Sequence, residues 1–320
     1  MIIIFYFKLI MIIAFSFFDK IIKQKVVIAY GLNNKYTFPT LVSITSIMEN
    51  GYSNTYYIFY LLVNKKNFKK ENRQILINLE KKYEKCEVNI IGISNKNLIK
   101  ANTKRYPLSA YYRLYLAELI PDLNRIIYLD GDTLIYTDLS EMYNLYMGNN
   151  IILGFVDNSY KKAIKFGVKT YKYIVSGVLL INLKKMRKEK ITQKFTDFIE
   201  KFQIKLTQED QTVINVVLHG RIDFLPPKFG IWNFRNNKSV LYHNYYRKEN
   251  LGIKAYDEKE ILKAWNSPSI LHYVKAKPWS KNSKIEYLKF NNDWWKYARM
   301  TDEYNNIISF YKRHIYSFYY

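Results

Sequence analysis

The chain has 320 residues, 49% of them hydrophobic, and its 50 basic and 27 acidic side chains give a formal net charge of +23. A chain of this size can bury the core of one large domain, with or without an appendage. The positive charge accompanies no recognisable nucleic-acid-binding module, so we expect no nucleic-acid partner. The single cysteine, Cys86, excludes an internal disulfide framework.

The amino-terminal segment, residues 1–24, differs from the rest of the chain. Residues 2–18 are apolar except for Lys8 and Ser16, close to the minimum length of a membrane-spanning helix. Three interpretations are open: a single membrane anchor, a secretory signal peptide that leads to a lumen, or a mis-assigned start. The lysines that follow favour a catalytic domain on the cytosolic side.

The first predicted strand leads into the loop Gly31-Leu32-Asn33-Asn34-Lys35-Tyr36. Gly31 permits a tight turn, and the two asparagines offer donors and acceptors suited to a ribose or a base. Residues 38–48 then show helical spacing. Alone this would be an ordinary Gly-Asn loop, but strand, loop and helix at the start of an α/β domain are typical of nucleotide binding.

The remaining pattern alternates between strands and helices, which predicts an α/β fold. We find no internal repeat and no low-complexity linker. The predicted strands cover residues 56–63, 88–93, 126–129 and 175–183, and the predicted helices cover residues 68–85, 108–119 and 188–202, with another starting near residue 208.

The most informative segment is Ile126-Ile127-Tyr128-Leu129-Asp130-Gly131-Asp132. Four apolar residues suit a buried parallel strand, and they end at two carboxylates separated by one small residue. Ligands of open α/β sheets bind beyond the carboxyl ends of the strands. Alternation points Asp130 and Asp132 the same way, so the pair predicts a site for a divalent cation that could carry a diphosphate.

Three other interpretations of this motif were weighed. A solvated acidic turn remains open. An EF-hand loop fails because Leu134 and Ile135 stand where a ligand and a glycine are required. An aspartate-nucleophile phosphotransferase shares Asp-x-Asp after a buried strand, but that family needs a glycine between the second aspartate and the threonine, and its motif usually opens the domain.

A candidate third ligand follows the apolar pair Ile270-Leu271. A histidine in this position is more often structural. If His272 faces the same cleft, however, an imidazole joined to two carboxylates favours Mn²⁺ over Mg²⁺. Lys277 could then neutralise the diphosphate of a leaving group.

Six motifs in order give the chain a resemblance to glycosyltransferase family 8, the retaining enzymes that include bacterial lipopolysaccharide glucosyl- and galactosyltransferases and glycogenin. The resemblance runs over about residues 25–280. The matching segments are Ile28-Ala29-Tyr30-Gly31, Tyr111-Tyr112-Arg113-Leu114, Tyr128-Leu129-Asp130-Gly131-Asp132, Ser176-Gly177-Val178-Leu179-Leu180-Ile181-Asn182-Leu183, Glu209-Asp210-Gln211, and His272-Tyr273 to Lys277-Pro278-Trp279.

The resemblance implies a GT-A nucleotide-diphospho-sugar transferase fold with a mixed, mainly parallel sheet flanked by helices. It implies that a UDP-sugar donor passes glucose or galactose, with retention, to a glycan or glycolipid hydroxyl. Asp130, Asp132 and His272 would ligate Mn²⁺, with Mg²⁺ as the alternative. The expected catalytic residues are Asp157, Asp210 and Gln211, and the expected donor contacts are Ala29, Tyr30, Asn33, Asn34, Tyr36, Arg113, Asp130, Gly131 and Lys277.

The chain departs from the family pattern at three places. The nucleotide loop has Asn33-Asn34-Lys35 where an acidic residue is usual, and Val175 stands where an asparagine is common. The final motif lacks a glycine and is one residue shorter. A non-catalytic nucleotide-sugar or glycan-binding protein of the same fold is therefore the alternative.

The catalytic domain is expected to cover residues 25–280, followed by a basic and aromatic extension, residues 281–320. In the extension, aromatic rings combine with cationic heads, as in elements that contact membranes, or else Trp294 and Trp295 pack onto the catalytic domain. The net charge suits an anionic membrane surface, where glycolipid acceptors reside, although it could also reflect biased codon usage. We expect a cytoplasmic enzyme in peripheral contact with the membrane.

Overall fold

The computed structural model describes residues 24–94, 107–168, 172–202, 209–233, 236–244, 255–274, 277–280 and 288–315. The predicted amino-terminal segment, apart from Gln24, therefore lies outside the described residues. The same holds for Lys275 and for residues 281–287 and 316–320 of the predicted extension.

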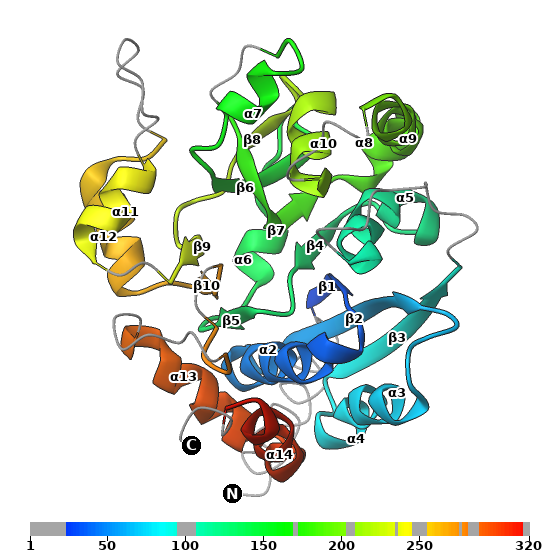
Figure 1. Ribbon diagram of the computed structural model, residues 1–320, viewed down its shortest axis with the longest axis vertical. Helices are drawn as coiled ribbons and strands as arrows, with labels where there is room; N and C mark the ends of the chain where they lie inside the picture. The colour runs from blue at the N-terminus through cyan, green and yellow to red at the C-terminus, as the bar shows by residue number, and fades with distance from the viewer. Residues whose placement is uncertain are drawn as a thin grey trace, which may run out of the picture.

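A central sheet organises the described part of the chain (Figure 1). Strand β1 pairs in parallel with β2 and β4, β2 with β3, and β6 with β8, whereas β7 runs antiparallel to both β4 and β6. The sheet is therefore mixed and mainly parallel. Its order is β3 (Cys86–Ile93), β2 (Thr55–Asn64), β1 (Gln24–Gly31), β4 (Ile126–Leu129), β7 (Ile174–Ile181), β6 (Ile152–Val156) and β8 (Ile222–Phe224).

Strand β4 is short, apolar and completely buried, as its sequence predicted. It was predicted to be a parallel strand, but it is parallel only to β1 and antiparallel to β7. Apolar composition reports burial on both faces and not the direction of the neighbouring strand. The backbone N–H of Asp130 donates to the carbonyl of Gly177 at 2.8 Å, which fixes the end of β4 against β7.

A smaller sheet lies beside the carboxyl end of β4. It has the order β5 (Thr133–Ile135), β10 (Ile270–His272) and β9 (Phe229–Trp232). Strand β10 runs antiparallel to β5, with His272 opposite Thr133. The N–H of Tyr273 also donates to the carbonyl of Asp132 at 2.9 Å. The smaller sheet thereby joins the histidine motif to the Asp-x-Asp motif.

The predicted helix over residues 68–85 is divided into α3 (Lys70–Ile77) and α4 (Leu79–Lys82) at Asn78. The predicted helix over residues 108–119 is mostly a 3₁₀ helix, η3 (Leu108–Tyr115), which continues as α5 (Leu116–Leu119). Residues three apart share one face of a 3₁₀ helix, which places Ala110 and Arg113 together on the same wall of a cleft.

The remaining helices lie around the two sheets. The predicted strand over residues 175–183 ends at Ile181, because Asn182 caps the next helix by accepting a 2.9 Å hydrogen bond from the N–H of Lys185. These helices are α2 (Thr37–Asn50), which follows the 3₁₀ turn η1 (Asn34–Tyr36), and α6 (Ser140–Tyr143), α7 (Lys161–Ile164), α8 (Leu183–Lys188), α9 (Ile191–Phe202), α10 (Glu209–Val217), α11 (Asn237–Asn244), α12 (Glu258–Asn266), α13 (Leu288–Arg299) and α14 (Tyr304–Ile315). Helix α12 contacts β9 of the smaller sheet, and α13 contacts α2 and α14.

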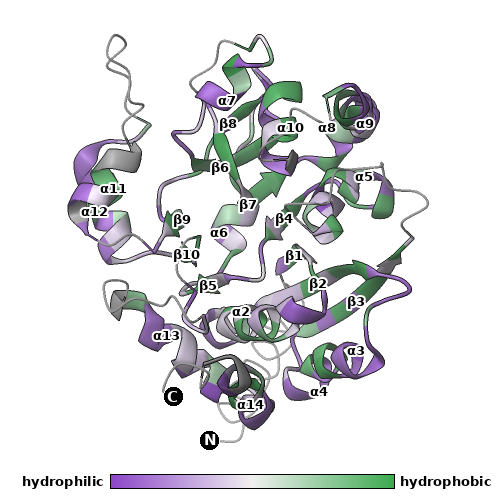
Figure 2. Ribbon diagram, in the orientation of Figure 1, coloured by the Kyte–Doolittle hydropathy of each residue, from purple (hydrophilic) through white to green (hydrophobic). Residues whose placement is uncertain are grey.

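The described part of the carboxyl-terminal extension packs onto the core. Trp294 is fully buried, with its ring centroid 4.7 Å from that of Trp279, and Tyr136 donates to the Asp293 carboxylate at 2.8 Å. Figure 2 colours β6 and β7 mainly hydrophobic, whereas hydrophilic residues appear on the outer helices α9 and α13. The burial of Trp294 agrees with the second interpretation of the extension, in which this residue packs onto the catalytic domain.

Candidate active site

A cleft of about 480 Å³ opens where the central sheet, the smaller sheet and α10 meet. It brings together residues from motifs far apart in the chain. The expected site residues that line it are Asn33, Tyr36, Arg113, Asp130, Gly131, Asp132, Asp157, Asp210, Gln211, His272 and Lys277.

Asp130, Asp132 and His272 form a potential cation site, because one ligand atom of each lies within 4.8 Å of the others. The Nε2 atom of His272 is 3.2 Å from Oδ1 of Asp132 and 3.8 Å from Oδ2 of Asp130. Two carboxylates and an imidazole are suitable ligands for Mn²⁺.

The surroundings of Gly177 provide an independent test of whether these residues fit a cation. A Cβ atom at Gly177 would lie 2.2 Å from Cε1 of His272 and 2.6 Å from Oδ2 of Asp130. The backbone of β7 thus comes so close to His272 and Asp130 that only glycine leaves both side chains in place. The donor set and the space around it therefore fit a divalent cation.

Arg113 lies beneath the cation site and is almost completely buried. Its guanidinium contacts the carboxylates of Asp130 at 2.8 Å and Asp210 at 3.2 Å, and it stacks 4.3 Å from the centroid of the Tyr128 ring. Burial alone would lower the pKa of Arg113, but the nearby carboxylates raise it above its ordinary value. Arg113 therefore remains charged and joins the cation site to α10.

The two aspartates of the motif have different electrostatic surroundings. Burial raises the pKa of Asp130 above its ordinary value, although Arg113 opposes the shift. Burial acts in the same direction on Asp132, but Lys277 and His272 outweigh it and lower the pKa of Asp132. The ammonium group of Lys277 donates to Oδ2 of Asp132 and to the carbonyl of Tyr273.

A second polar group lies on the wall formed by β6 and α10. Nε2 of Gln211 donates to Oδ2 of Asp157 at 2.6 Å, and the N–H of Ser159 donates to Oδ1 of Asp157 at 2.8 Å. Asn215 anchors α10 to β7 by accepting from the N–H of Ile174 and donating to its carbonyl, each at 2.8 Å. The side chains of Asp157 and Gln211 are therefore held in fixed orientations.

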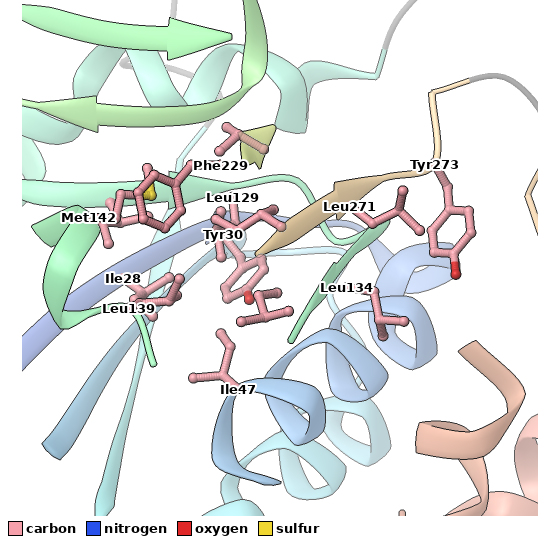
Figure 3. Packing of buried hydrophobic residues seen from close by; sticks show 14 of the residues in the cluster. Ile28, Tyr30, Ile47, Leu129, Leu134, Leu139, Met142, Phe229, Leu271 and Tyr273 are labelled. Atoms are coloured by element: carbon pink, nitrogen blue, oxygen red, sulfur yellow. The ribbon is translucent and has the colours of Figure 1, made fainter. Parts of the chain in front are cut away.

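Three expected donor contacts do not line this cleft. Ala29 and Tyr30 are fully buried in β1, and the Tyr30 hydroxyl lies 2.9 Å from the Ser43 hydroxyl of α2. Figure 3 shows the ring of Tyr30 directed into the layer between the sheet and α2. Asn34 faces an adjacent pocket, where it donates to the carbonyl of Asn67 at 2.8 Å and accepts from the N–H of Lys69 at 3.0 Å.

The cleft also contains residues to which the sequence analysis assigned no catalytic, metal-binding or donor-binding role. Some come from segments between the motifs, and others, such as Ser176 and Gly177, lie within the quoted motifs without an assigned role. An aromatic residue that ends a short apolar strand was the only sequence signal for Trp232. The additional lining residues are Gly31, Pro107, Ser109, Ala110, Asn158, Ser159, Val175, Ser176, Gly177, Trp232 and Val274.

The fold is similar to those of solved glycosyltransferases. The galactosyltransferase LgtC, solved in complex with donor and acceptor sugar analogues, superposes with a TM-score of 0.71 at 20% identity, over 88% of this chain and all (100%) of that one. The glycosyltransferase GlyE of Streptococcus pneumoniae TIGR4 gives a TM-score of 0.60 at 20% identity, over 91% of this chain and 64% of that one. The chain has the GT-A fold.

The sequence of the chain also matches a protein-family model. The model described as Glycosyl transferase family 8 matches residues 27–283. The chain belongs to glycosyltransferase family 8, as its motifs predicted.

Curated relatives agree with this assignment. The lipopolysaccharide 1,2-glucosyltransferase of Escherichia coli (strain K12) is 27% identical over 311 residues, which cover 90% of this chain and 83% of that protein. The General stress protein A of Bacillus subtilis (strain 168) is 29% identical over 186 residues, 56% of this chain and 62% of that protein. A Haemophilus influenzae protein is 30% identical over 216 residues, and the match spans 63% of its length.

Among the helices of the described residues, none combines the length and the apolar character needed to cross a membrane.

Proposed function

We propose that this glycosyltransferase moves glucose or galactose from a UDP-sugar to a hydroxyl of a glycan or glycolipid, with Mn²⁺ as its cofactor. The observation that carries this proposal is that the cation site, Lys277 and the hydrogen-bonded Asp157–Gln211 pair line one cleft. The relative in Escherichia coli, named as a lipopolysaccharide 1,2-glucosyltransferase, supports a glycolipid acceptor.

The proposed donor site is built around charge. Asp130, Asp132 and His272 would hold Mn²⁺, which supplies Lewis-acid stabilisation of the charge that develops on the leaving diphosphate. Lys277 lines the same cleft and would add a positive charge beside the diphosphate. Asn33 and Tyr36, at the end of β1, would contact the nucleoside, while Arg113 would contact the sugar.

The proposed transfer retains the configuration of the sugar by front-face displacement. The bond from the acceptor oxygen to the anomeric carbon forms as the bond to the diphosphate breaks, and the departing phosphate oxygen takes the proton of the acceptor hydroxyl. Asp157, Asp210 and Gln211 would orient the sugars, and orientation alone can supply several kcal/mol. Asp157 and Gln211 are hydrogen-bonded to each other, which suits a positioning role better than a nucleophilic one.

Asp132→Ala tests the metal assignment. We expect the variant to fold cooperatively and to lose donor hydrolysis and sugar transfer. Wild-type activity should require Mn²⁺ and disappear in excess chelator. Full activity in chelator, measured on a panel of UDP-sugars, would exclude the metal from the reaction.

Peripheral contact with an anionic membrane, on the cytosolic face, is part of the same proposal. The net charge of +23 supports it, because basic surface residues are attracted to anionic lipid head groups. The buried Trp294 is not available for such contact, so the attraction would depend on exposed cationic side chains.

A further inference from the structure

Both carboxylates of the cation site already have hydrogen-bond partners within the protein. Asp130 accepts from Arg113 at 2.8 Å and from the Tyr128 hydroxyl at 3.1 Å. Asp132 has Oδ1 beside His272 at 3.2 Å and Oδ2 in contact with the Lys277 ammonium group. A divalent cation that binds Asp132 must therefore compete with Lys277.

Lys277 can leave Asp132 without a movement of the main chain. The carbonyl of Lys277 accepts from the N–H of Ser280 at 3.0 Å and from its hydroxyl at 3.1 Å, so a local turn holds the backbone. The side chain itself is partly exposed, lines the cleft and has a flexible four-carbon stem. Its ammonium group can thus exchange one anionic partner for another nearby.

We propose that Lys277 couples cation binding to diphosphate binding, by neutralising Asp132 until a nucleoside diphosphate draws its ammonium group away. The inference rests on the proposed function, because it takes Asp130, Asp132 and His272 as the cation ligands. Without a diphosphate, the entering cation meets a triad whose charges are already compensated by Arg113 and Lys277. With a diphosphate, Lys277 gains a new anionic partner and Asp132 becomes available.

The coupling must be reciprocal. If a diphosphate strengthens cation binding, the cation strengthens diphosphate binding by the same factor. Free Mn²⁺ would bind weakly and the pair would bind together, which keeps the cation site from filling before the donor arrives. Couplings of this kind typically change an affinity by about 5–150-fold.

Lys277→Met tests the coupling, because methionine keeps much of the length of the side chain and removes its charge. The affinity for Mn²⁺ alone is measured by electron paramagnetic resonance of free Mn²⁺, and the affinity for UDP by calorimetry with and without Mn²⁺. We expect the variant to bind Mn²⁺ alone roughly tenfold more tightly than the wild type and to bind UDP more weakly. A purely structural role of Lys277 would weaken both.

Two further variants make the outcome decisive. Lys184→Met removes an exposed charge on α8, outside the cleft lining, and should leave both affinities unchanged. Asp132→Asn should abolish Mn²⁺ binding in either background. If it does, and Lys277→Met leaves the affinity for Mn²⁺ alone unchanged or weaker, the coupling is wrong while the metal site stands. If Mn²⁺ binding is independent of Asp132, the metal site and the coupling both fail.

Discussion

At the scale of single residues, Gly177 is a position with no room for a larger side chain. We expect Gly177→Ala to displace His272 or Asp130, because the added methyl group would lie 2.2 Å from one and 2.6 Å from the other. A displacement of about 1 Å at a reacting centre can cost roughly 100-fold in rate. We therefore predict a loss of about that size in kcat/KM, with weaker Mn²⁺ binding.

Gly92→Ala, on the outer strand β3, is a matched control, since its added methyl group would come no closer than 3.3 Å to Lys65. It should keep both the activity and the melting temperature. Gly177→Ala with wild-type Mn²⁺ affinity would show that the ligands can move aside without cost.

Asp138 should make the fold sensitive to acid. Its carboxylate accepts from the N–H of Tyr52, the hydroxyl of Tyr57 and the N–H of Ser140, each at 2.8 Å. Burial would raise its pKa, but these hydrogen bonds lower it below the ordinary value of 3.8. The stabilisation is thus fully present above pH 3.8 and is lost as the pH falls through the lower folded-state pKa.

Asp138→Asn replaces one acceptor oxygen with a donor and should cost about 1–3 kcal/mol of unfolding free energy at neutral pH. The difference in unfolding free energy between the variant and the wild type should shrink as the pH falls below 3.8. Urea unfolding of the variant and the wild type at pH 7, 5 and 3 measures the cost at neutral pH and its decrease at low pH. A difference that stays constant across these pH values would contradict the role given to the Asp138 charge.

At the residue scale, two neighbouring asparagines that were expected to contact the donor have different surroundings. Asn33 and Asn34 are neighbours of the same type, yet only Asn33 lines the main cleft. The η1 turn between β1 and α2 directs Asn34 toward the first turn of α3, where it accepts from Asn72 at 2.9 Å. Side-chain direction in a turn depends on tertiary contacts that residue type does not encode.

At the scale of elements, α13 joins the carboxyl-terminal extension to the core. Trp294 is fully buried, and its ring centroid is 6.2 Å from that of Tyr311 on α14. We predict that Trp294→Ala lowers the unfolding free energy by about 3–5 kcal/mol. Removal of residues 293–320 should therefore lower the melting temperature as well, instead of affecting membrane binding alone.

Trp295→Ala is the natural comparison, because Trp295 is only partly buried and meets Trp294 edge to face at 4.8 Å. Thermal unfolding should show a clearly smaller loss for this variant. Equal losses would mean that the two rings contribute as one unit.

Elements were predictable where a single period governs the sequence. The apolar runs of β4 and β7 and the strand-loop-helix opening lie where their patterns indicated. The 3₁₀ form of η3 was not predicted, since its apolar spacing also fits an α-helix. For α13 the sequence left two interpretations open, because alternating Trp, Tyr, Lys and Arg suit a membrane surface and a protein core equally well.

At the scale of the whole molecule, the positive charge should govern association with membranes. We predict that the protein binds anionic vesicles and leaves them as salt rises from 50 to 500 mM, because the range of surface charge falls from about 10 Å at 0.1 M salt to about 3 Å at 1 M. Co-sedimentation with anionic and neutral vesicles measures this. Binding that persists in high salt would indicate insertion of apolar residues instead.

The family and the central sheet were predictable from the chain alone, because six motifs in order constrain the topology more than any one of them does. Where the motifs lie on strand ends, as with Asp130 and Asp132, the position of these side chains in the cleft was predictable too. Trp232 and Asn158 were not, since they come from segments whose sequence has no pattern of its own. Their place in the cleft results from the packing of the smaller sheet against the larger one.

The pairing of β5 with β10 also has a consequence for the time course of folding. His272 and Asp132 are 140 residues apart in the chain, and their strands must pair before the two ligands meet. Closing a loop of that length costs about 4 kcal/mol of chain entropy, and such non-local contacts form slowly. During refolding, binding of Mn²⁺ should therefore lag behind the helical circular dichroism signal. On the ribosome, the site should stay incomplete until β10 has emerged, when most of the central sheet can already have formed.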